Sequence, residues 1–133
     1  LVKKLSLMKA GLLEEWKQAL GQGNAIRQRH VRRIVNQLQG ATAAWGGLPL
    51  LRVPVLCRSR MDRQRLKGAC QALGLGSMYP SGINMISDLE GLHDPEAFPG
   101  AAMIAERLVT LPTHHLVSSV DERKLVRALR TND

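Results

Sequence analysis

The run LRVPVLCRSRMDRQRLKGACQALGLG, residues 51–76, decides the fold expected of this chain. Apolar residues alternate from Leu51 to Cys57, which predicts a strand with one buried face, and Pro54 within it indicates an edge strand. Asp62 is the expected N-cap of a following helix, and Gly74 is expected to end it in a left-handed conformation. The apolar positions of that helix recur at helical spacing: Leu66, Ala69, Cys70 and Leu73.

The chain after this unit predicts further short elements of both kinds. The apolar residues 75–79 indicate a second strand that runs into a loop of about 15 residues, a length that is often functional. Pro99 fits the first position of a helix, and residues 109–111 indicate a third strand. Ser118 and Asp121 have the spacing of a capping box, which predicts a terminal helix.

The chain before it reads as two helices. The first carries apolar residues at helical spacing and is expected to end at Gly21 and Gly23, and Asn24 is the expected cap of the second. We therefore expect an α/β chain of the α+β type, with a small, mainly antiparallel sheet of about three strands packed with helices. We expect one small domain, 1–133, made of a helical portion (1–39), a glycine-rich linker (40–49) and a sheet-and-helix portion (50–133).

Composition points to one globular core. The 133 residues are 44% apolar and 23% charged, and aromatic residues make up 3%, so aliphatic side chains must form the core. The net charge of +8 comes mainly from arginines dispersed over three predicted helices. Because no aromatic residues are interleaved with them for base stacking, we do not expect nucleic acid as a partner.

Several kinds of site are not supported by the sequence. Cys57 and Cys70 lack the Cys/His spacing of a zinc site and are expected to be buried free thiols in the cytoplasm. His114 and His115 are adjacent, so in a strand or turn they point apart and do not grip a metal together. No GxSxG, GxGxxG or GK[ST] motif is present, and no run approaches the roughly 20 apolar residues of a membrane span.

Three pieces of the chain, in this order and spacing, resemble the C-terminal region of the DegT/DnrJ/StrS family of pyridoxal-phosphate-dependent sugar aminotransferases. They are LRVPVLCRSR (51–60), GLGSMYPSG (74–82) and FPGAAMIAERLVTLPTHHLVSSVDERKLVRAL (98–129). In that family an aromatic residue and a proline open a helix, a turn similar to TLPTH follows its end, and an acidic residue starts the terminal helix. The family often has a histidine before the tyrosine of the middle piece, where this chain has Met78 before Tyr79.

The resemblance implies the small domain of an aminotransferase, which lines one wall of a substrate pocket and closes over a nucleotide-sugar or polysaccharide-precursor substrate. It implies pyridoxal phosphate in the parent protein, held by an N-terminal cofactor-binding domain of the same chain, and a homodimer. The chain lacks the lysine context of the cofactor site, so we expect no catalytic residue in it, and whether it belongs to an active enzyme stays open. Tyr79, His114 and Arg58 are the expected substrate-binding residues.

The residues leave a second interpretation open. A free-standing basic domain with this topology is expected to bind an anionic saccharide, a nucleotide or nucleic acid without any transamination chemistry. The chain begins at Leu1 rather than Met, and we expect it to be part of a larger protein.

Overall fold

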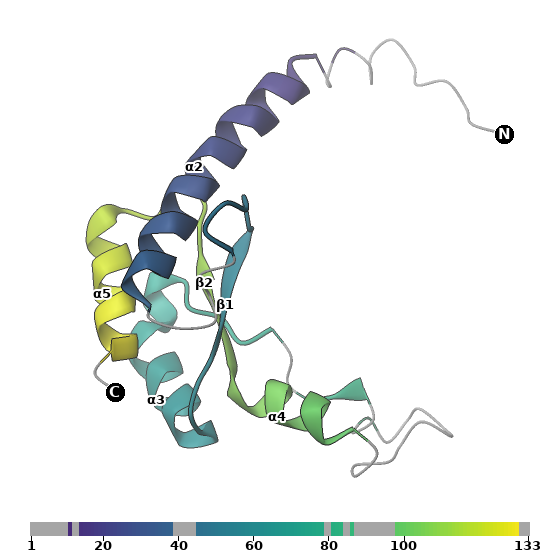
Figure 1. The fold of residues 1–133 in the computed structure, drawn as a ribbon, viewed down its shortest axis with the longest axis vertical. Helices are drawn as coiled ribbons and strands as arrows, with labels where there is room; N and C mark the ends of the chain where they lie inside the picture. Colours follow the sequence, from purple (N-terminus) through teal and green to yellow (C-terminus); the bar gives the residue numbers. More distant parts are fainter. Residues whose placement is uncertain are drawn as a thin grey trace, which may run out of the picture.

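The computed structural model describes residues 11, 14–38, 45–78, 81–83, 86 and 98–130. This part of the chain forms an α+β fold in which helices pack against an antiparallel pair of strands (Figure 1). The predicted mixed fold is confirmed at that level. In chain order the elements are α2 (Trp16–Gln37), β1 (Arg52–Leu56), α3 (Arg60–Cys70), the 3-10 helix η2 (Gln71–Leu73), α4 (Pro99–Arg107), β2 (Leu108–Pro112) and α5 (Ser119–Arg130).

The two strands pair along their whole length, with a register that runs from Arg52 opposite Pro112 to Leu56 opposite Leu108. On the other edge of β2, Gly76 forms an isolated bridge with Thr110 through two backbone hydrogen bonds of 3.0 and 2.7 Å. The strand expected over 75–79 is therefore a single bridge within the described residues. Residues 77 and 78 form no further bridge, and Tyr79 lies outside the described part.

Pro54 lies at a position of β1 where the sheet needs no backbone N–H from it. It lies opposite Thr110, whose N–H and C=O both bond to Gly76 on the far side of β2. The Pro54–Thr110 pair therefore needs no hydrogen bond from β1, and proline has no N–H to give. Within the described residues β1 pairs only with β2, so the predicted edge position of Pro54 is confirmed.

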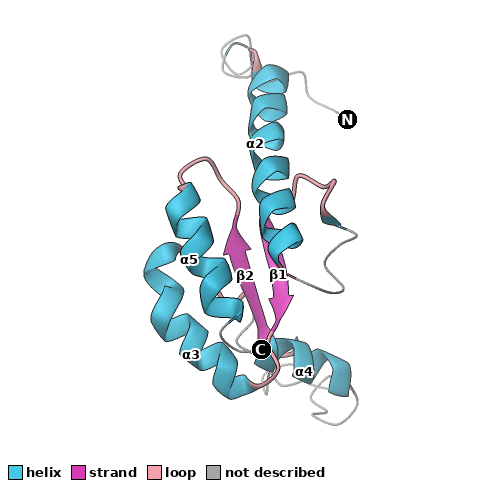
Figure 2. Ribbon diagram, turned by 60° about the vertical axis from the view of Figure 1, so that its left-hand side comes forward, coloured by secondary structure: helices cyan, strands magenta, loops and turns pink. Residues whose placement is uncertain are grey.

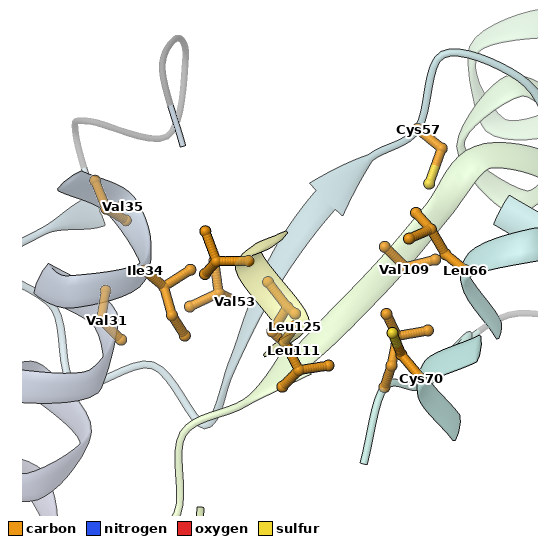
Figure 3. Packing of buried hydrophobic residues seen from close by; sticks show 12 residues of the cluster. Val31, Ile34, Val35, Val53, Cys57, Leu66, Cys70, Val109, Leu111 and Leu125 are labelled. Atoms are coloured by element: carbon orange, nitrogen blue, oxygen red, sulfur yellow. The ribbon is translucent and has the colours of Figure 1, made fainter. Parts of the chain in front are cut away.

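The core lies between the strand pair and three helices. Val53, Val109 and Leu111 alternate toward one face of the sheet and are fully buried. They meet apolar residues of α2, α3 and α5, so these three helices cover that face (Figures 2 and 3). Each fully buried Val or Leu contributes about 1.5–3 kcal/mol. The helical members of the cluster are Val31, Ile34, Val35, Leu66, Cys70, Leu125 and Val126.

The N-terminal half of α2 extends beyond the sheet (Figure 1). α2 runs without interruption through Gly21, Gly23 and Asn24, so the prediction of a helix ending at the glycines and a second one capped by Asn24 is wrong. Two glycines cost about 1 kcal/mol each in a helix but do not forbid it. Asn24 instead accepts a hydrogen bond of 2.9 Å from Arg27. The earlier part of the predicted first helix lies outside the described residues.

A serine caps the N-terminus of α3 and another caps that of α5. The Ser59 hydroxyl accepts from the backbone N–H of Asp62 at 3.1 Å, so Ser59 and not Asp62 is the N-cap of α3. Asp62 lies inside the first turn, where its carboxylate accepts from the Ser59 hydroxyl. The capping box predicted for α5 is confirmed, because the backbone N–H of Asp121 donates to the Ser118 hydroxyl at 3.1 Å.

A buried polar contact ties α2 to α5. His30 Nδ1 lies 2.7 Å from Glu122 Oε2, and both side chains are buried. At the C-terminal end of α5, the Arg130 guanidinium donates to the carbonyl of Gln37 at 2.8 and 2.6 Å. These contacts join residues 92 and 93 positions apart, so the two helices run parallel.

We expect His30→Ala and Glu122→Ala each to lower the free energy of unfolding by about 3 kcal/mol, because each leaves a buried polar partner unsatisfied. The double variant is expected to lose less than the sum of the two. Urea unfolding of the four proteins measures this. Glu106→Ala, at an exposed position of α4, is the control and should stay within about 0.5 kcal/mol of the parent. Additive losses would contradict the coupling.

Candidate functional site

The candidate site lies where Gly76 joins β2, and Arg52 holds it together. The side chain of Arg52 donates from Nε to the Thr110 hydroxyl at 2.7 Å and from Nη2 to the Thr110 carbonyl at 2.9 Å. Nη2 also donates to the carbonyl of Gly74. The Thr110 hydroxyl in turn donates to the carbonyl of Gly76 at 3.2 Å. This network fixes the segment 74–76, from which the chain continues toward Tyr79.

The guanidinium of Arg52 bonds only to neutral oxygens. Burial lowers the pKa of Arg52, yet an arginine side chain stays protonated in proteins. Among the described residues, no carboxylate contacts Arg52 to neutralise its charge. This charged group lies on the sheet face opposite the core, together with Pro54 and Leu56.

Two glycines permit the close approach of this segment to the sheet. Gly74 has φ 84°, a left-handed conformation, which confirms the predicted C-terminal glycine, although η2 extends α3 before it. A Cβ on Gly74 would lie 3.1 Å from Cγ of Pro112, and one on Gly76 would lie 3.1 Å from Nη2 of Arg52. A side chain at Gly74 would be strained by the positive φ and would crowd Pro112, and one at Gly76 would displace the guanidinium of Arg52.

A cavity of about 260 Å³ lies beside this segment, between η2 and the start of α5. Its volume is just below the range of roughly 300–1,000 Å³ that is usual for ligand pockets, so it fits part of a ligand. His114 and Asp121 are its polar lining residues, and the Asp121 carboxylate accepts from the Ser118 hydroxyl at 2.6 Å. The remaining lining residues are Ala72, Leu73, Gly74, Leu116 and Val117.

The turn that carries His114 is anchored from both sides. The preceding residue, Thr113, is fully buried, and its hydroxyl lies 2.6 Å from the carbonyl oxygen of Leu50 and 2.8 Å from that of Leu51. After His114 the chain closes a turn in which the N–H of Val117 donates to the His114 carbonyl at 3.1 Å. The imidazole of His114 is exposed at the cavity, where it has room to bond a ligand hydroxyl.

The three predicted binding residues do not form one cluster in the described structure. His114 lines the cavity. Arg58 is exposed just after β1, beside the end where Leu56 pairs with Leu108, whereas His114 follows the opposite end, where Arg52 pairs with Pro112. The length of the strand pair therefore separates Arg58 from His114. Tyr79 lies outside the described residues.

No lysine among the described residues lies in an enclosed site like that of the Schiff-base lysine in a pyridoxal-phosphate enzyme. Lys17, Lys67 and Lys124 are the lysines in this part of the chain, and all three are exposed. Nor do the described residues contain a group of three or more His, Cys, Asp or Glu side chains that could hold a metal ion. The chemistry available at the candidate site is hydrogen bonding by His114 and Asp121.

Both cysteines are buried free thiols, as predicted. Burial raises the pKa of Cys57; the Asp62 carboxylate raises it further, and the Arg63 guanidinium opposes this in part. Burial also raises the pKa of Cys70. A thiol that keeps its proton is a poor nucleophile, so neither cysteine is suited to covalent catalysis at neutral pH.

No family model, curated protein or solved structure significantly matches this chain. The resemblance to sugar aminotransferases therefore stays a prediction. No helix within the described ranges is long and apolar enough to cross a membrane.

Sequence reasoning missed Arg52 and the buried pair of His30 and Glu122. Arg52 is one of many arginines, and its only sequence signal is that it falls on the outer face of a predicted strand. His30 precedes Val31 on the buried side of α2, but its partner is 92 positions away, and no local pattern identifies it.

We expect Gly74→Ala to destabilise the chain by about 1–2 kcal/mol, because the new Cβ disfavours a positive φ and crowds Pro112. Gly68→Ala is the matched control. Gly68 lies within α3 with open space around it, so this change should stabilise by about 0.5–1 kcal/mol. Thermal unfolding of both variants measures the difference, and equal shifts would contradict the strained conformation of Gly74.

Alkaline pH should destabilise the chain through its thiols. Because burial favours the neutral thiol, its contribution to stability is complete below the thiol pKa of the unfolded chain and is lost as pH rises through the higher pKa of the folded chain. We expect the free energy of unfolding to fall more between about pH 8 and pH 10 than in a Cys57→Ala/Cys70→Ala variant. Urea unfolding across this range tests it; parallel pH profiles would refute the contribution of the thiols.

Proposed function

We propose that this chain is the C-terminal domain of a pyridoxal-phosphate-dependent, aminotransferase-like protein that acts on nucleotide-sugar or polysaccharide-precursor substrates. In this proposal it forms one wall of the substrate pocket and is not catalytic alone. The cofactor supplies the electron sink for amino transfer and belongs to an N-terminal domain of the same protein. The intact protein is proposed to be a cytoplasmic homodimer.

The observation that carries the proposal is the convergence of two stretches that resemble the family. Gly76, from the glycine–tyrosine–proline stretch, bonds to Thr110, the first residue of TLPTH, through two backbone hydrogen bonds. The cavity lies where these stretches meet, and it is lined by Gly74 from one and by His114 from the other. Residues separated by about 40 positions in the sequence therefore face the same small space, as expected of a binding wall.

Exposed apolar side chains support the proposal that a second domain packs against this one. On the outer face of the strand pair, Leu56 at the end of β1 is 48% exposed. On the projecting part of α2, Trp16 and Leu20 are 50% and 47% exposed. Large apolar side chains that stay this exposed on two elements are typical of a domain that packs against another domain.

Each residue of the site has a defined part in this proposal. His114 bonds a hydroxyl of the sugar, and Arg52 acts as a positioning residue that fixes the start of the loop toward Tyr79. Tyr79 contributes a phenol beside the sugar. Arg58, at the far end of the strand pair, would reach only a different part of the substrate or of the neighbouring domain.

The first experiment determines the mass of the natural gene product that contains this chain and tests it for bound pyridoxal phosphate. We expect a product well above the size of the chain itself, with a visible Schiff-base absorbance that is lost when an amino donor passes its amino group to the cofactor and that returns when the keto sugar accepts that group. A product of about the size of this chain, with no cofactor and no transamination, would refute the proposal and leave a basic binding domain.

In the intact protein we expect His114→Ala to raise the KM for the sugar substrate about tenfold, because it removes a hydrogen bond at the cavity. The melting temperature should not change, since the imidazole is exposed. His115→Ala is the matched control, because His115 is also exposed but does not line the cavity. Tyr79→Phe should likewise weaken sugar binding more than thermal stability. Unchanged KM in His114→Ala would remove this residue from the site.

A further inference from the structure

The outer surface of the parallel helices α2 and α5 brings together arginines that the sequence disperses. Arg33 lies three residues after His30 and four before Gln37, and both of these contact α5. Arg123 and Arg127 lie seven and three residues before Arg130, whose guanidinium reaches α2. Arg33 and this pair therefore border the contact between the two helices from its two sides.

The two rows have the same spacing. On α2, Ile26 is followed by Arg29 and Arg33 at i+3 and i+7, and on α5, Val120 is followed by arginines at the same two intervals. All four arginines are exposed, and Val120 is 47% exposed. We call these six residues the paired-arginine face: Ile26, Arg29, Arg33, Val120, Arg123 and Arg127.

Three of the four arginines of this face have no counter-charge among the described residues. In the part of the chain that is described, the side chains of Arg29, Arg33 and Arg123 make no hydrogen bond or ion pair. The carboxylate nearest in sequence, Glu122, is buried against His30, and Asp121 faces the cavity on the other side of α5. Residues four apart rise about 6 Å along a helix, which is less than the Debye length of about 8 Å in physiological salt. The guanidinium groups of Arg29 and Arg33 therefore repel each other, and a bound anion would relieve this.

We propose that the paired-arginine face docks an acidic amphipathic helix of a partner protein or domain. Arginine binds carboxylates through two parallel hydrogen bonds, and carboxylates spaced by one helical turn match the 6 Å step along each row. The apolar Ile26 and Val120 at the start of the rows fit an apolar residue one turn before those carboxylates. This docking surface is separate from the cavity and does not depend on the proposed function.

Other occupants fit the face less well. A second copy of the chain that used the same face would place arginine against arginine, which like-charge repulsion disfavours. Nucleic acid would find four phosphate contacts and no aromatic side chain among the six face residues, whereas single-strand binders rely on stacking and duplex binders on more phosphates. Ile26 and Val120, at the apolar end of each row, offer neither a charge nor a hydrogen bond to a phosphate backbone. They can instead pack against an apolar side chain of a protein.

The test is binding of a labelled synthetic helix of about 20 residues, with leucine followed by glutamate at i+3 and i+7 in each repeat. A peptide of the same composition in scrambled order is its control, and fluorescence anisotropy measures both with the full chain. We expect the patterned peptide to bind at least about tenfold more tightly than the scrambled one, because only the former matches the spacing of the face.

Charge-reversed variants locate the site. Arg33→Glu/Arg123→Glu should weaken binding of the patterned peptide at least about tenfold, whereas Arg60→Glu/Arg65→Glu, which makes the same charge change at exposed positions of α3, should weaken it less than about threefold. Arg33→Gln/Arg123→Gln should give an intermediate loss and guards against a fold defect, which circular dichroism would reveal.

Three results would overturn the proposal. The first is equal binding of the patterned and scrambled peptides, or no binding of either. The second is an equal loss in the α3 control variant, which would reduce the effect to net charge. The third is tighter binding of a mixed-sequence DNA duplex of about 20 base pairs that the same face variants abolish, which would make nucleic acid the partner.

Discussion

The direction of the backbone polar groups of Thr110 determines how this small sheet is built. Its N–H and C=O both bond to Gly76 and turn away from β1. A residue without an N–H, Pro54, is therefore tolerated opposite Thr110. Arg52, two residues before Pro54 and on the same face of the sheet, reaches across to the side chain of Thr110. The glycine segment and the arginine that bonds to it are both arranged around this residue.

The strands and the later helices could be predicted from the sequence because their signals are local. Alternation over residues 51–57, the left-handed glycine at 74 and the serine cap before α5 each involve contacts within a few residues. The division of the N-terminal helix failed for the same reason. Glycine propensity is a local term of about 1 kcal/mol, and here the helix continues through both glycines into a half that packs on the sheet and α5.

The candidate site was predictable only in part. His114 could be singled out through the resemblance of its turn, but its place at a cavity depends on Thr113 bonding to the chain before β1, more than 60 positions away. Arg52 and the contact of His30 with Glu122 join residues 58 and 92 positions apart. Single-sequence patterns carry no information about such pairs, and the meeting of α2 and α5 arginines depends on the same long-range packing.

The contacts by which Arg52 holds the glycine segment depend little on pH or salt concentration. Carboxylate anchors weaken when acid protonates them or when salt screens them. Every acceptor of Arg52 in the described structure is a carbonyl or a hydroxyl, none of which titrates between acidic and mildly alkaline conditions. The start of the loop therefore stays attached to the sheet when the acidity or ionic strength of its surroundings changes.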